Sequence, residues 1–144
     1  KPCELLPIIE ETVALYKDGH PAIRFETRLT DAIPIMNLDR KQIKQAMINL
    51  VDNAIASIKN DGDILITLIH DPILKIVRLE VSDNGPGISD EDKTRLFEPY
   101  FSTKKAGMGL GLTIVRAIVS DHNGMIRVQD NHPKGAKFII EFQA

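Results

Sequence analysis

Residues 40–60, RKQIKQAMINLVDNAIASIKN, are predicted to form a helix with one apolar face. Its apolar residues recur at intervals of three and four, which places them on one side of an α-helix. Asp39, just before this stretch, is a suitable N-cap because its carboxylate accepts hydrogen bonds from the first free amide groups. Asp61-Gly62 is a turn signal that ends the helix. A helix with a single apolar face needs a surface to cover, so we expect the flanking segments to supply a sheet.

The flanking segments are predicted to contain several strands. Ile23–Leu29 alternates apolar and charged residues, as a half-buried strand does. A short strand is expected around residues 34–38. Two further alternating stretches, Ile64–Leu68 and Val77–Val81, are predicted to form an antiparallel pair, because the turn at Asp71-Pro72 lies between them.

The ends of the chain complete the expected architecture. Residues 4–18 have helical spacing and are stopped by Gly19-His20-Pro21. A further helix is predicted from about Leu110 to Asp121, and Ile126–Val128 and Phe138–Phe142 are predicted to form a closing hairpin. Together these segments predict an α+β fold, a two-layer sandwich in which about three helices cover one face of a mixed, mostly antiparallel sheet.

The composition is that of one ordinary soluble domain. The 144 residues include 18 Lys+Arg and 20 Asp+Glu, for a net charge of −2, and 43% are apolar. No repeat or linker-like stretch divides the chain, so residues 1–144 are expected to form a single domain. The near-neutral balance argues against a nucleic-acid partner, which would need a strongly basic surface. The single cysteine, Cys3, excludes an internal disulfide and fits a reducing compartment.

Two asparagines within the first predicted helix are candidate ligands. Asn49 and Asn53 are four residues apart, so they lie one above the other on one helix face, expected at the border of the apolar side. Asparagine is a mediocre helix former, and two in mid-helix need a reason. They are either solvated surface residues or neutral oxygen ligands for a Mg²⁺ ion that already carries phosphate.

A second candidate is the acid at the end of a predicted strand. Asp83 is followed by Gly85 and Gly87 in the sequence Val-Ser-Asp-Asn-Gly-Pro-Gly-Ile, residues 81–88. A carboxylate accepts a hydrogen bond from an exocyclic amine such as that of adenine, and glycine lets the backbone pass close to a ligand. The alternative is a plain Asp-Asn-Gly turn.

A third candidate is the glycine-rich segment 107–112, Gly-Met-Gly-Leu-Gly-Leu, which opens the last predicted helix. Its spacing differs from the dinucleotide fingerprint, and it lacks the Gly-Lys-Ser/Thr ending of a Walker A loop. Glycine-exposed amides at a helix N-terminus are nevertheless a natural phosphate seat. The alternative is a flexible connector.

The segment before it, residues 95–105, has three aromatic residues and a basic pair inside a long stretch without periodic pattern. Such a loop in a compact domain is usually functional or disordered. Aromatic side chains such as Phe97 and Phe101 can hold a loop against the body, and Lys104 can meet a terminal phosphate as a point charge. The alternative is an ordinary surface loop.

The order of these four segments resembles a known family. Asn49-x-x-x-Asn53, Asp83-x-Gly85-x-Gly87, Phe97-x-x-x-Phe101 and Gly107-x-Gly109-x-Gly111 resemble the four sequence boxes of sensor histidine kinases. The resemblance runs from about Asp39 to Phe142, and Phe-Ser-Thr-Lys at 101–104 looks most like the nitrogen-regulation group. It implies a Bergerat-type fold, shared with gyrase, mismatch-repair and heat-shock-chaperone ATPases, and ATP with Mg²⁺ as cofactors.

The resemblance also implies a role for each box. Asp83 would bind the adenine amino group, and Asn53, with Asn49, would hold Mg²⁺ against the phosphates. Gly85 and Gly87 would let the backbone pass close to the base. The amides of Gly109, Leu110 and Gly111 would hold phosphates, and residues from about 88 to 108 would form an ATP lid. Further candidates for nucleotide contact are Ile88, Phe101, Lys104, Gly107 and Leu112, with Lys104 positioning phosphate.

The residue at position 49 favours one branch of this superfamily. In the ATP-hydrolysing relatives the corresponding position holds a glutamate that activates water, whereas Asn49 is an amide and takes no proton at neutral pH. The resemblance therefore implies a kinase domain that transfers the γ-phosphate of ATP to a histidine on a separate dimerisation domain, with a response regulator downstream. The alternatives are a self-contained ATPase and a non-enzymatic nucleotide-sensing or docking module.

Two positions depart from the family pattern. A basic residue is common three positions after the second asparagine, where this chain has Ala56, and a Gly-Thr pair often opens the last strand, where it has Gly135-Ala136. The missing hydroxyl at position 136 would remove a hydrogen bond near the base. Because the chain opens with Lys1-Pro2, we interpret it as a piece of a longer protein. We expect this domain to be cytoplasmic, and a membrane anchor elsewhere in the parent protein is compatible with this expectation.

Overall fold

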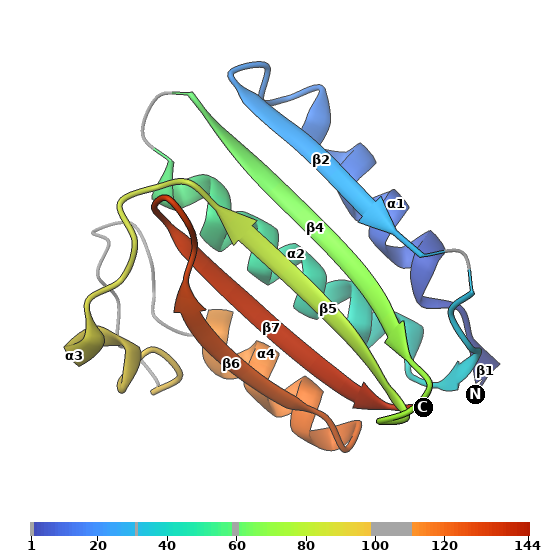
Figure 1. Cartoon of the computed structure of the whole chain (residues 1–144). Helices are drawn as coiled ribbons and strands as arrows, with labels where there is room; N and C mark the ends of the chain where they lie inside the picture. The colour runs from blue at the N-terminus through green and yellow to red at the C-terminus, as the bar shows by residue number, and fades with distance from the viewer. Residues whose placement is uncertain (1, 31, 59–60, 99–110) are drawn as a thin grey trace.

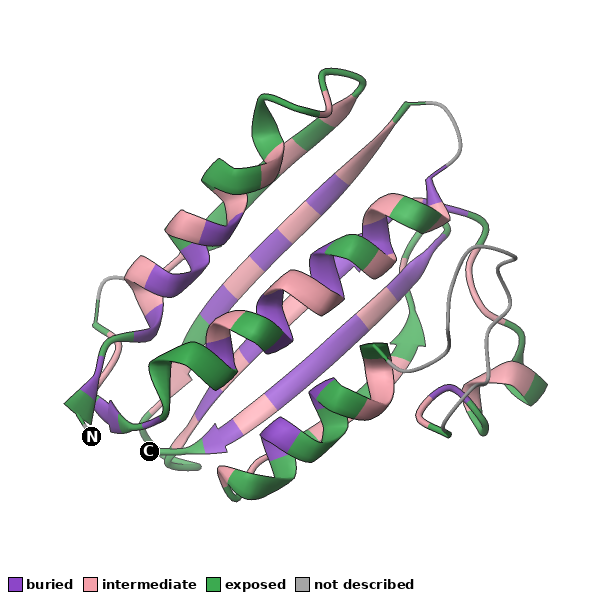
Figure 2. Ribbon diagram, turned by 180° about the vertical axis from the view of Figure 1, so that it is seen from behind, coloured by how far each residue is buried: buried purple, intermediate pink, exposed green. Residues whose placement is uncertain are grey.

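The computed structural model describes residues 2–30, 32–58, 61–98 and 111–144. Within these ranges the main sheet has five strands in the order β2-β4-β5-β7-β6. Helices α1, α2 and α4 lie on one face of this sheet, and the other face is open (Figures 1 and 2). This confirms the predicted α+β sandwich. The strands are β1 (Pro2–Cys3), β2 (Ile23–Leu29), β3 (Met36–Asn37), β4 (Gly62–Asp71), β5 (Ile76–Asp83), β6 (Met125–Asp130) and β7 (Ala136–Gln143), and the helices are α1 (Leu5–Lys17), α2 (Arg40–Ser57), α3 (Asp90–Lys93) and α4 (Gly111–Asp121).

The sheet is mixed and mostly antiparallel, as predicted. Strand β2 pairs with β4 in parallel, and the β4–β5, β5–β7 and β6–β7 pairs are antiparallel. The chain reaches β4 from β2 by way of α2, which supplies the long crossover that a parallel pair requires.

Helix α2 lies over the centre of the sheet, and its apolar side supplies much of the core. Asp39 caps it by accepting a hydrogen bond from the Gln42 amide at 3.1 Å. The buried α2 side chains are Ile43, Ala46, Met47, Leu50, Val51 and Ala54. They pack against the helix-facing side chains of β4, β5 and β7, where buried residues alternate with partly exposed ones (Figure 2).

The structure differs from the sequence expectations in a few local details. Strands β4 and β5 extend beyond the predicted stretches. Their pairing continues from Asp71 opposite Ile76 at one end to Ile64 opposite Asp83 at the other. Pro2–Cys3 forms the short strand β1, which pairs with β3 and was not predicted. A short helix, α3, also lies within the stretch predicted to have no regular structure, and Ser89 caps it through the Asp92 amide. Within the described ranges, no helix has the length and apolar content of a membrane span.

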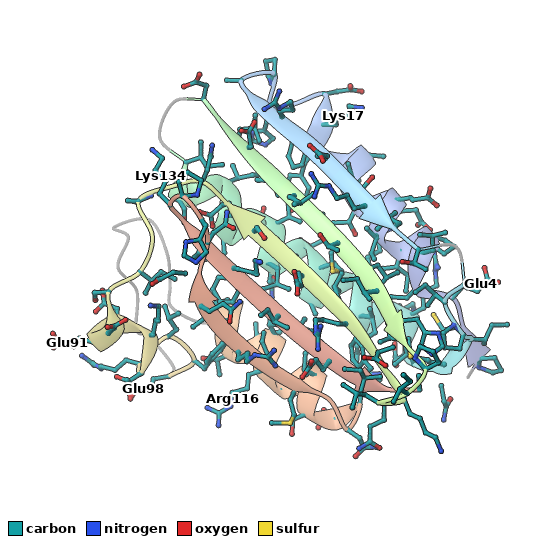
Figure 3. All side chains as sticks on the ribbon, viewed as in Figure 1. Glu4, Lys17, Glu91, Glu98, Arg116 and Lys134 are labelled. Atoms are coloured by element: carbon teal, nitrogen blue, oxygen red, sulfur yellow. The ribbon has the colours of Figure 1, made fainter. Side chains whose placement is uncertain are left out.

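The open face of the sheet carries a network of ion pairs over a buried apolar residue. Ile139 is only 2% exposed. Its neighbours Phe138 and Ile140 belong to the helix-facing core. Side chains alternate along a strand, so Ile139 faces away from the helices. Glu141 accepts from Arg78 at 2.9 Å and from Arg127 at 2.8 Å. Figure 3 shows this face with its side chains. Arg127 and Glu80 are the cross-strand partners of Ile139, and the stems of such long charged side chains can cover an apolar neighbour while their charged ends pair.

Replacing Glu141 with glutamine is expected to lower the free energy of unfolding at pH 7 by on the order of 1 kcal/mol. Burial raises the pKa of Glu141, but the hydrogen bonds from Arg127 and Arg78 lower it by more, so the net pKa lies below its usual value. The contribution is therefore complete above the unfolded pKa of about 4.3 and is lost as the pH falls through the lower folded value.

Urea unfolding at pH 7 and in steps from about pH 5 to pH 3 measures this difference. We expect the two chains to differ at neutral pH and to converge in acid. Glu26→Gln serves as a control, because Glu26 pairs with Arg28 while 53% of its side chain is exposed and such pairs contribute little. An equal difference at every pH would contradict the role given to the Glu141 carboxylate.

Candidate functional site

Asp83 lies at the end of β5, buried beneath the loop that follows. It is 2% exposed, and its Oδ1 accepts hydrogen bonds from the Gly85 amide at 2.9 Å and the Ala136 amide at 3.4 Å. Amide donors stabilise the charged form of a carboxylate. The side chain is therefore held by one donor from its own loop and one from the start of β7.

Helix α2 ends against the same loop. A Cβ built on Gly85 would lie 2.8 Å from the carbonyl oxygen of Ser57 and 3.2 Å from Oδ1 of Asp83. Ser57 in turn donates its hydroxyl to the carbonyl of Asn53 at 3.1 Å. Gly85 thus has no room for a side chain, because it lies between the last residue of α2 and the acid. The turn that carries Asn53 and the loop that carries Asp83 are in contact.

Asn49 connects α2 to the start of α4. Its Nδ2 donates to the carbonyl oxygen of Gly111 at 3.3 Å, and its Oδ1 accepts from Nε2 of Gln45 at 2.9 Å. Gly111 is the first residue of α4, and a Cβ there would meet nothing within 4 Å. Both predicted asparagines are half-buried. Asn49 therefore contacts the last of the predicted phosphate-binding glycines, and the helical turn that follows Asn53 ends against the acid loop.

The turn between β6 and β7 forms one wall beside Asp83. Gly135 has φ +108° and lies against Asp83, because a Cβ there would come within 1.9 Å of the Asp83 carbonyl oxygen. Gly87 has φ +86°, and its Cβ would lie 3.3 Å from the carbonyl oxygen of Gly135. Both glycines adopt a backbone conformation that other residues rarely take. The sequence indicated a turn at Gly135 but not its contact with Asp83.

The segment after Gly87 is held against the body by an aromatic contact. Phe97 packs edge-on against Phe138 of β7, with ring centroids 6.4 Å apart and an interplanar angle of 85°. Thr113 of α4 donates its hydroxyl to the Phe97 carbonyl oxygen at 2.9 Å. Ile88 and Leu112 are partly buried against the core. Thr113 was not among the sequence candidates, because a lone threonine in a helix carries no signal for such a contact.

The remaining sequence candidates lie outside the described residues. They are Phe101, Lys104, Gly107, Gly109 and Leu110. No group of three or more His, Cys, Asp or Glu side chains able to hold a metal occurs among the residues that are described. Asn49 and Asn53 can supply two side-chain oxygens to Mg²⁺. So small a set of protein ligands fits magnesium, which is commonly held by few protein oxygens together with substrate phosphates.

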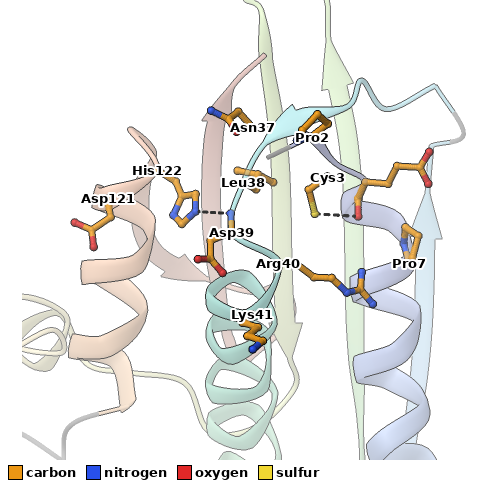
Figure 4. Close-up of a pocket in the computed structure, with 11 residues that line it drawn as sticks. Pro2, Cys3, Pro7, Asn37, Leu38, Asp39, Arg40, Lys41, Asp121 and His122 are labelled. Carbon is orange, nitrogen blue, oxygen red and sulfur yellow. Dashed lines mark hydrogen bonds between the residues drawn. The ribbon is translucent and has the colours of Figure 1, made fainter.

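A separate cavity of about 920 Å³ lies at the opposite end of α2 (Figure 4). On its wall His122 accepts a hydrogen bond from the Asp39 amide through Nε2 at 3.0 Å, and Nδ1 lies 2.7 Å from the Ile118 carbonyl. The ring therefore acts as an acceptor that joins the end of α4 to the start of α2.

Comparison with known proteins agrees with this arrangement. The family described as "Histidine kinase-, DNA gyrase B-, and HSP90-like ATPase" matches residues 38–144. The nitrogen regulation protein NtrY of Azorhizobium caulinodans is 33% identical over 88% of this chain and 17% of its own length. The sensor histidine kinase ZraS of Escherichia coli O157:H7 is 33% identical over 95% of this chain and 30% of its own length. The chain thus spans less than a third of these curated relatives.

The solved structures point the same way. The nucleotide-free catalytic domain of histidine kinase ThkA superposes with a TM-score of 0.89 at 36% identity, covering 99% of this chain and 94% of that one. ThkA in complex with response regulator protein TrrA matches with a TM-score of 0.85 at 34% identity, covering 99% of this chain and 41% of that one. The chain therefore belongs to the histidine kinase-, DNA gyrase B- and HSP90-like ATPase family, as an ATP-binding catalytic domain of the sensor histidine kinase type.

Proposed function

We propose that this domain binds ATP with Mg²⁺ and transfers the γ-phosphate to a histidine on a separate dimerisation domain of the same protein. A response regulator then receives the phosphate. The observation that supports the proposal is that the C-terminal half of α2, which carries Asn49 and Asn53, contacts both the start of α4 and the loop that holds Asp83. Asn49 contacts the start of α4, and the turn of Asn53 contacts the loop that holds Asp83. The ThkA–TrrA complex supports the downstream partner by analogy.

Each group in the site has a role that matches its chemistry. The Asp83 carboxylate accepts a hydrogen bond from the adenine amino group. The carboxamide oxygens of Asn53 and Asn49 hold Mg²⁺, which neutralises phosphate charge when bound. The amides of Gly109, Leu110 and Gly111 receive the phosphates, with Gly111 at the N-terminus of α4. Lys104 positions the terminal phosphate as a point charge.

The transfer step needs little covalent chemistry from this domain. The bond from the γ-phosphorus to the bridging oxygen breaks, ADP leaves, and a phosphorus–nitrogen bond forms to the unprotonated nitrogen of the imidazole, whose other nitrogen then releases its proton to solvent. Catalysis is then positioning and charge neutralisation. Asn49 supplies no base for water, because a carboxamide takes no proton at neutral pH, so hydrolysis is expected to be slow.

The proposal extends to the rest of the chain and its surroundings. Residues 1–144 act as one catalytic domain, and residues 88–108 form a lid over the nucleotide. The Phe97–Phe138 contact supports a fixed base for this lid. Because ATP is the substrate, the domain works in the cytoplasm, and this placement is compatible with a membrane anchor elsewhere in the parent protein.

The test is phosphotransfer from labelled ATP, in the presence of Mg²⁺, to an added dimerisation domain carrying a phosphoacceptor histidine. We expect label on that domain and almost no steady-state hydrolysis by the 144-residue chain alone. Rapid hydrolysis without an acceptor would favour the self-contained ATPase. Nucleotide binding with neither transfer nor hydrolysis would favour a sensing or docking module.

In the same assay, Asn53→Ala is expected to reduce transfer by about a hundredfold at low Mg²⁺, because one oxygen ligand is lost. Titrating Mg²⁺ measures the effect, and a raised magnesium requirement is the expected signature. Asn37→Ala, an exposed position on β3 just before the start of α2, is the matched control, since it removes the same side chain away from the proposed ligand pair. Unchanged magnesium dependence in Asn53→Ala would show that the proposed metal role is wrong.

A further inference from the structure

The turn between β6 and β7 contributes a side chain to the loop that carries Asp83. Asn131, the first residue after β6, donates through Nδ2 to the main-chain carbonyl of Asp83 at 2.8 Å. Its own amide donates to the Gly135 carbonyl at 2.9 Å and closes the turn. Asn131 therefore closes the turn and also fastens it to Asp83, which lies 48 positions earlier in the chain.

The position of the Asp83 carboxylate depends on this backbone. Oδ1 is held by the Gly85 and Ala136 amides, so the side chain has little freedom of its own. Ala136 follows Gly135, and Gly135 packs directly on the Asp83 carbonyl. A shift of the Asp83 main chain against this turn would thus move the carboxylate. A hydrogen bond weakens steeply as it lengthens or bends, so a small shift would weaken a contact made by the second carboxylate oxygen of Asp83.

The neighbouring residue on the loop is anchored in a different place. Asn84 accepts from the Asp63 amide at 2.9 Å and donates to the Asp63 carboxylate at 3.3 Å. Asp63 is also paired with Arg24 at 2.9 Å. The loop is therefore fastened to β4 through Asn84 and to the β6–β7 turn through Asn131. Only the second fastening acts on the Asp83 peptide unit itself.

We propose that Asn131 is a positioning residue for recognition of the adenine amino group, acting through the Asp83 main-chain carbonyl. This inference rests on the proposed function, because it needs Asp83 to contact the base. It assigns part of the base selectivity of the domain to the β6–β7 turn, which none of the four sequence boxes includes. The test must separate this role from a general contribution to folding.

The size of the expected effect follows from the surroundings of Asn131. The residue is half-buried and lines a cavity of about 400 Å³ on the open side of the sheet, together with Ser82, Asn84 and Lys134 (Figure 3 labels Lys134). Water that enters this cavity can bond to the Asp83 carbonyl once the side chain is shortened. The carbonyl is then solvated and loses its link to the β6–β7 turn, while the pairing of Asp83 with Ile64 of β4 remains. The expected loss is therefore about tenfold in ATP affinity, with little change in thermal stability.

The experiment combines one substitution with one change in the ligand. ATP and purine riboside triphosphate, which lacks the 6-amino group, are titrated by calorimetry into the unsubstituted chain and into Asn131→Ala. We expect about tenfold weaker ATP binding in the variant and affinity for the second nucleotide unchanged within about twofold. Gln129→Ala, an exposed position on β6, is the control and should bind both nucleotides as the unsubstituted chain does.

The other outcomes each overturn a defined statement. Equal weakening of both nucleotides would mean that Asn131 supports the fold rather than base recognition, and unchanged ATP affinity would remove the role altogether. Asp83→Ala separates the proposals. If Asp83→Ala binds ATP normally, the proposed base contact is wrong. Asn131→Ala is also tested in the Asp83→Ala chain. If Asp83→Ala weakens ATP binding and adding Asn131→Ala weakens it by about a further tenfold, the base contact of Asp83 stands but the positioning role of Asn131 is wrong.

Discussion

Replacing Asp83 with alanine is expected to weaken ATP binding by about a hundredfold or more. Two losses combine in this variant. The charged acceptor for the adenine amino group disappears, and the Gly85 and Ala136 amides lose the oxygen that they share. These amides are buried, so leaving them without an acceptor displaces the loop as well. Calorimetric titration with ATP in the presence of Mg²⁺ measures the loss.

Asp18→Ala is the matched control for this prediction. Asp18 is an exposed aspartate at the end of α1, far along the chain from the loop, and its removal should leave ATP affinity unchanged. Thermal unfolding of both variants checks that each chain is folded at the temperature of the titration. ATP affinity within about twofold of the unsubstituted chain in Asp83→Ala would refute the proposed base contact.

Replacing Gly135 with alanine is expected to cost about 3 kcal/mol of folding free energy and to abolish measurable ATP binding. The new Cβ would lie 1.9 Å from the Asp83 carbonyl oxygen and 2.9 Å from the Asn84 Cα, so backbone must move. The residue would also have to keep φ at +108° or rearrange the turn. Either response moves the start of β7 away from the acid. Urea unfolding and ATP titration give the two readouts.

Gly19→Ala is the control for the glycine substitution. A Cβ at Gly19 would have the Tyr16 carbonyl oxygen as its near neighbour at 3.9 Å, which is an ordinary contact. We expect this variant to keep both stability and nucleotide affinity. A Gly135→Ala chain as stable as the Gly19→Ala chain would show that the turn does not press on the Asp83 loop.

Sequence reasoning predicted the layers of the fold because they depend on local patterns. The apolar spacing of α2, the cap at Asp39 and the alternation along β2 are visible within a few residues of sequence. The ends of β4 and β5 were less predictable, because a strand continues as long as its partner provides hydrogen bonds. The pairing of Ile64 with Asp83 depends on both strands. The short strand β1 also exists only because β3 lies beside it.

The order of the sequence boxes predicted the residue types of the proposed site but not what holds them. Asn49, Asn53 and Asp83 were recognisable by their spacing and chemistry. The supports came from elsewhere in the chain: Thr113 on the Phe97 carbonyl, and Gly135 and Asn131 on Asp83. These supports occur as single residues without a repeating pattern. Sequence reasoning had no basis for selecting them.

The amino-acid sequence alone predicted an α+β domain and the order of its longer helices and strands, and the four boxes predicted the family by resemblance. The predicted helices and strands follow from periodicity, which acts over short distances along the chain. The tertiary structure alone determined that the β6–β7 turn lies against the Asp83 peptide and that Asn49 reaches Gly111. The physical reason is that such contacts join residues far apart in sequence, and only the packing of α2, α4 and the sheet into one core sets the distances between them.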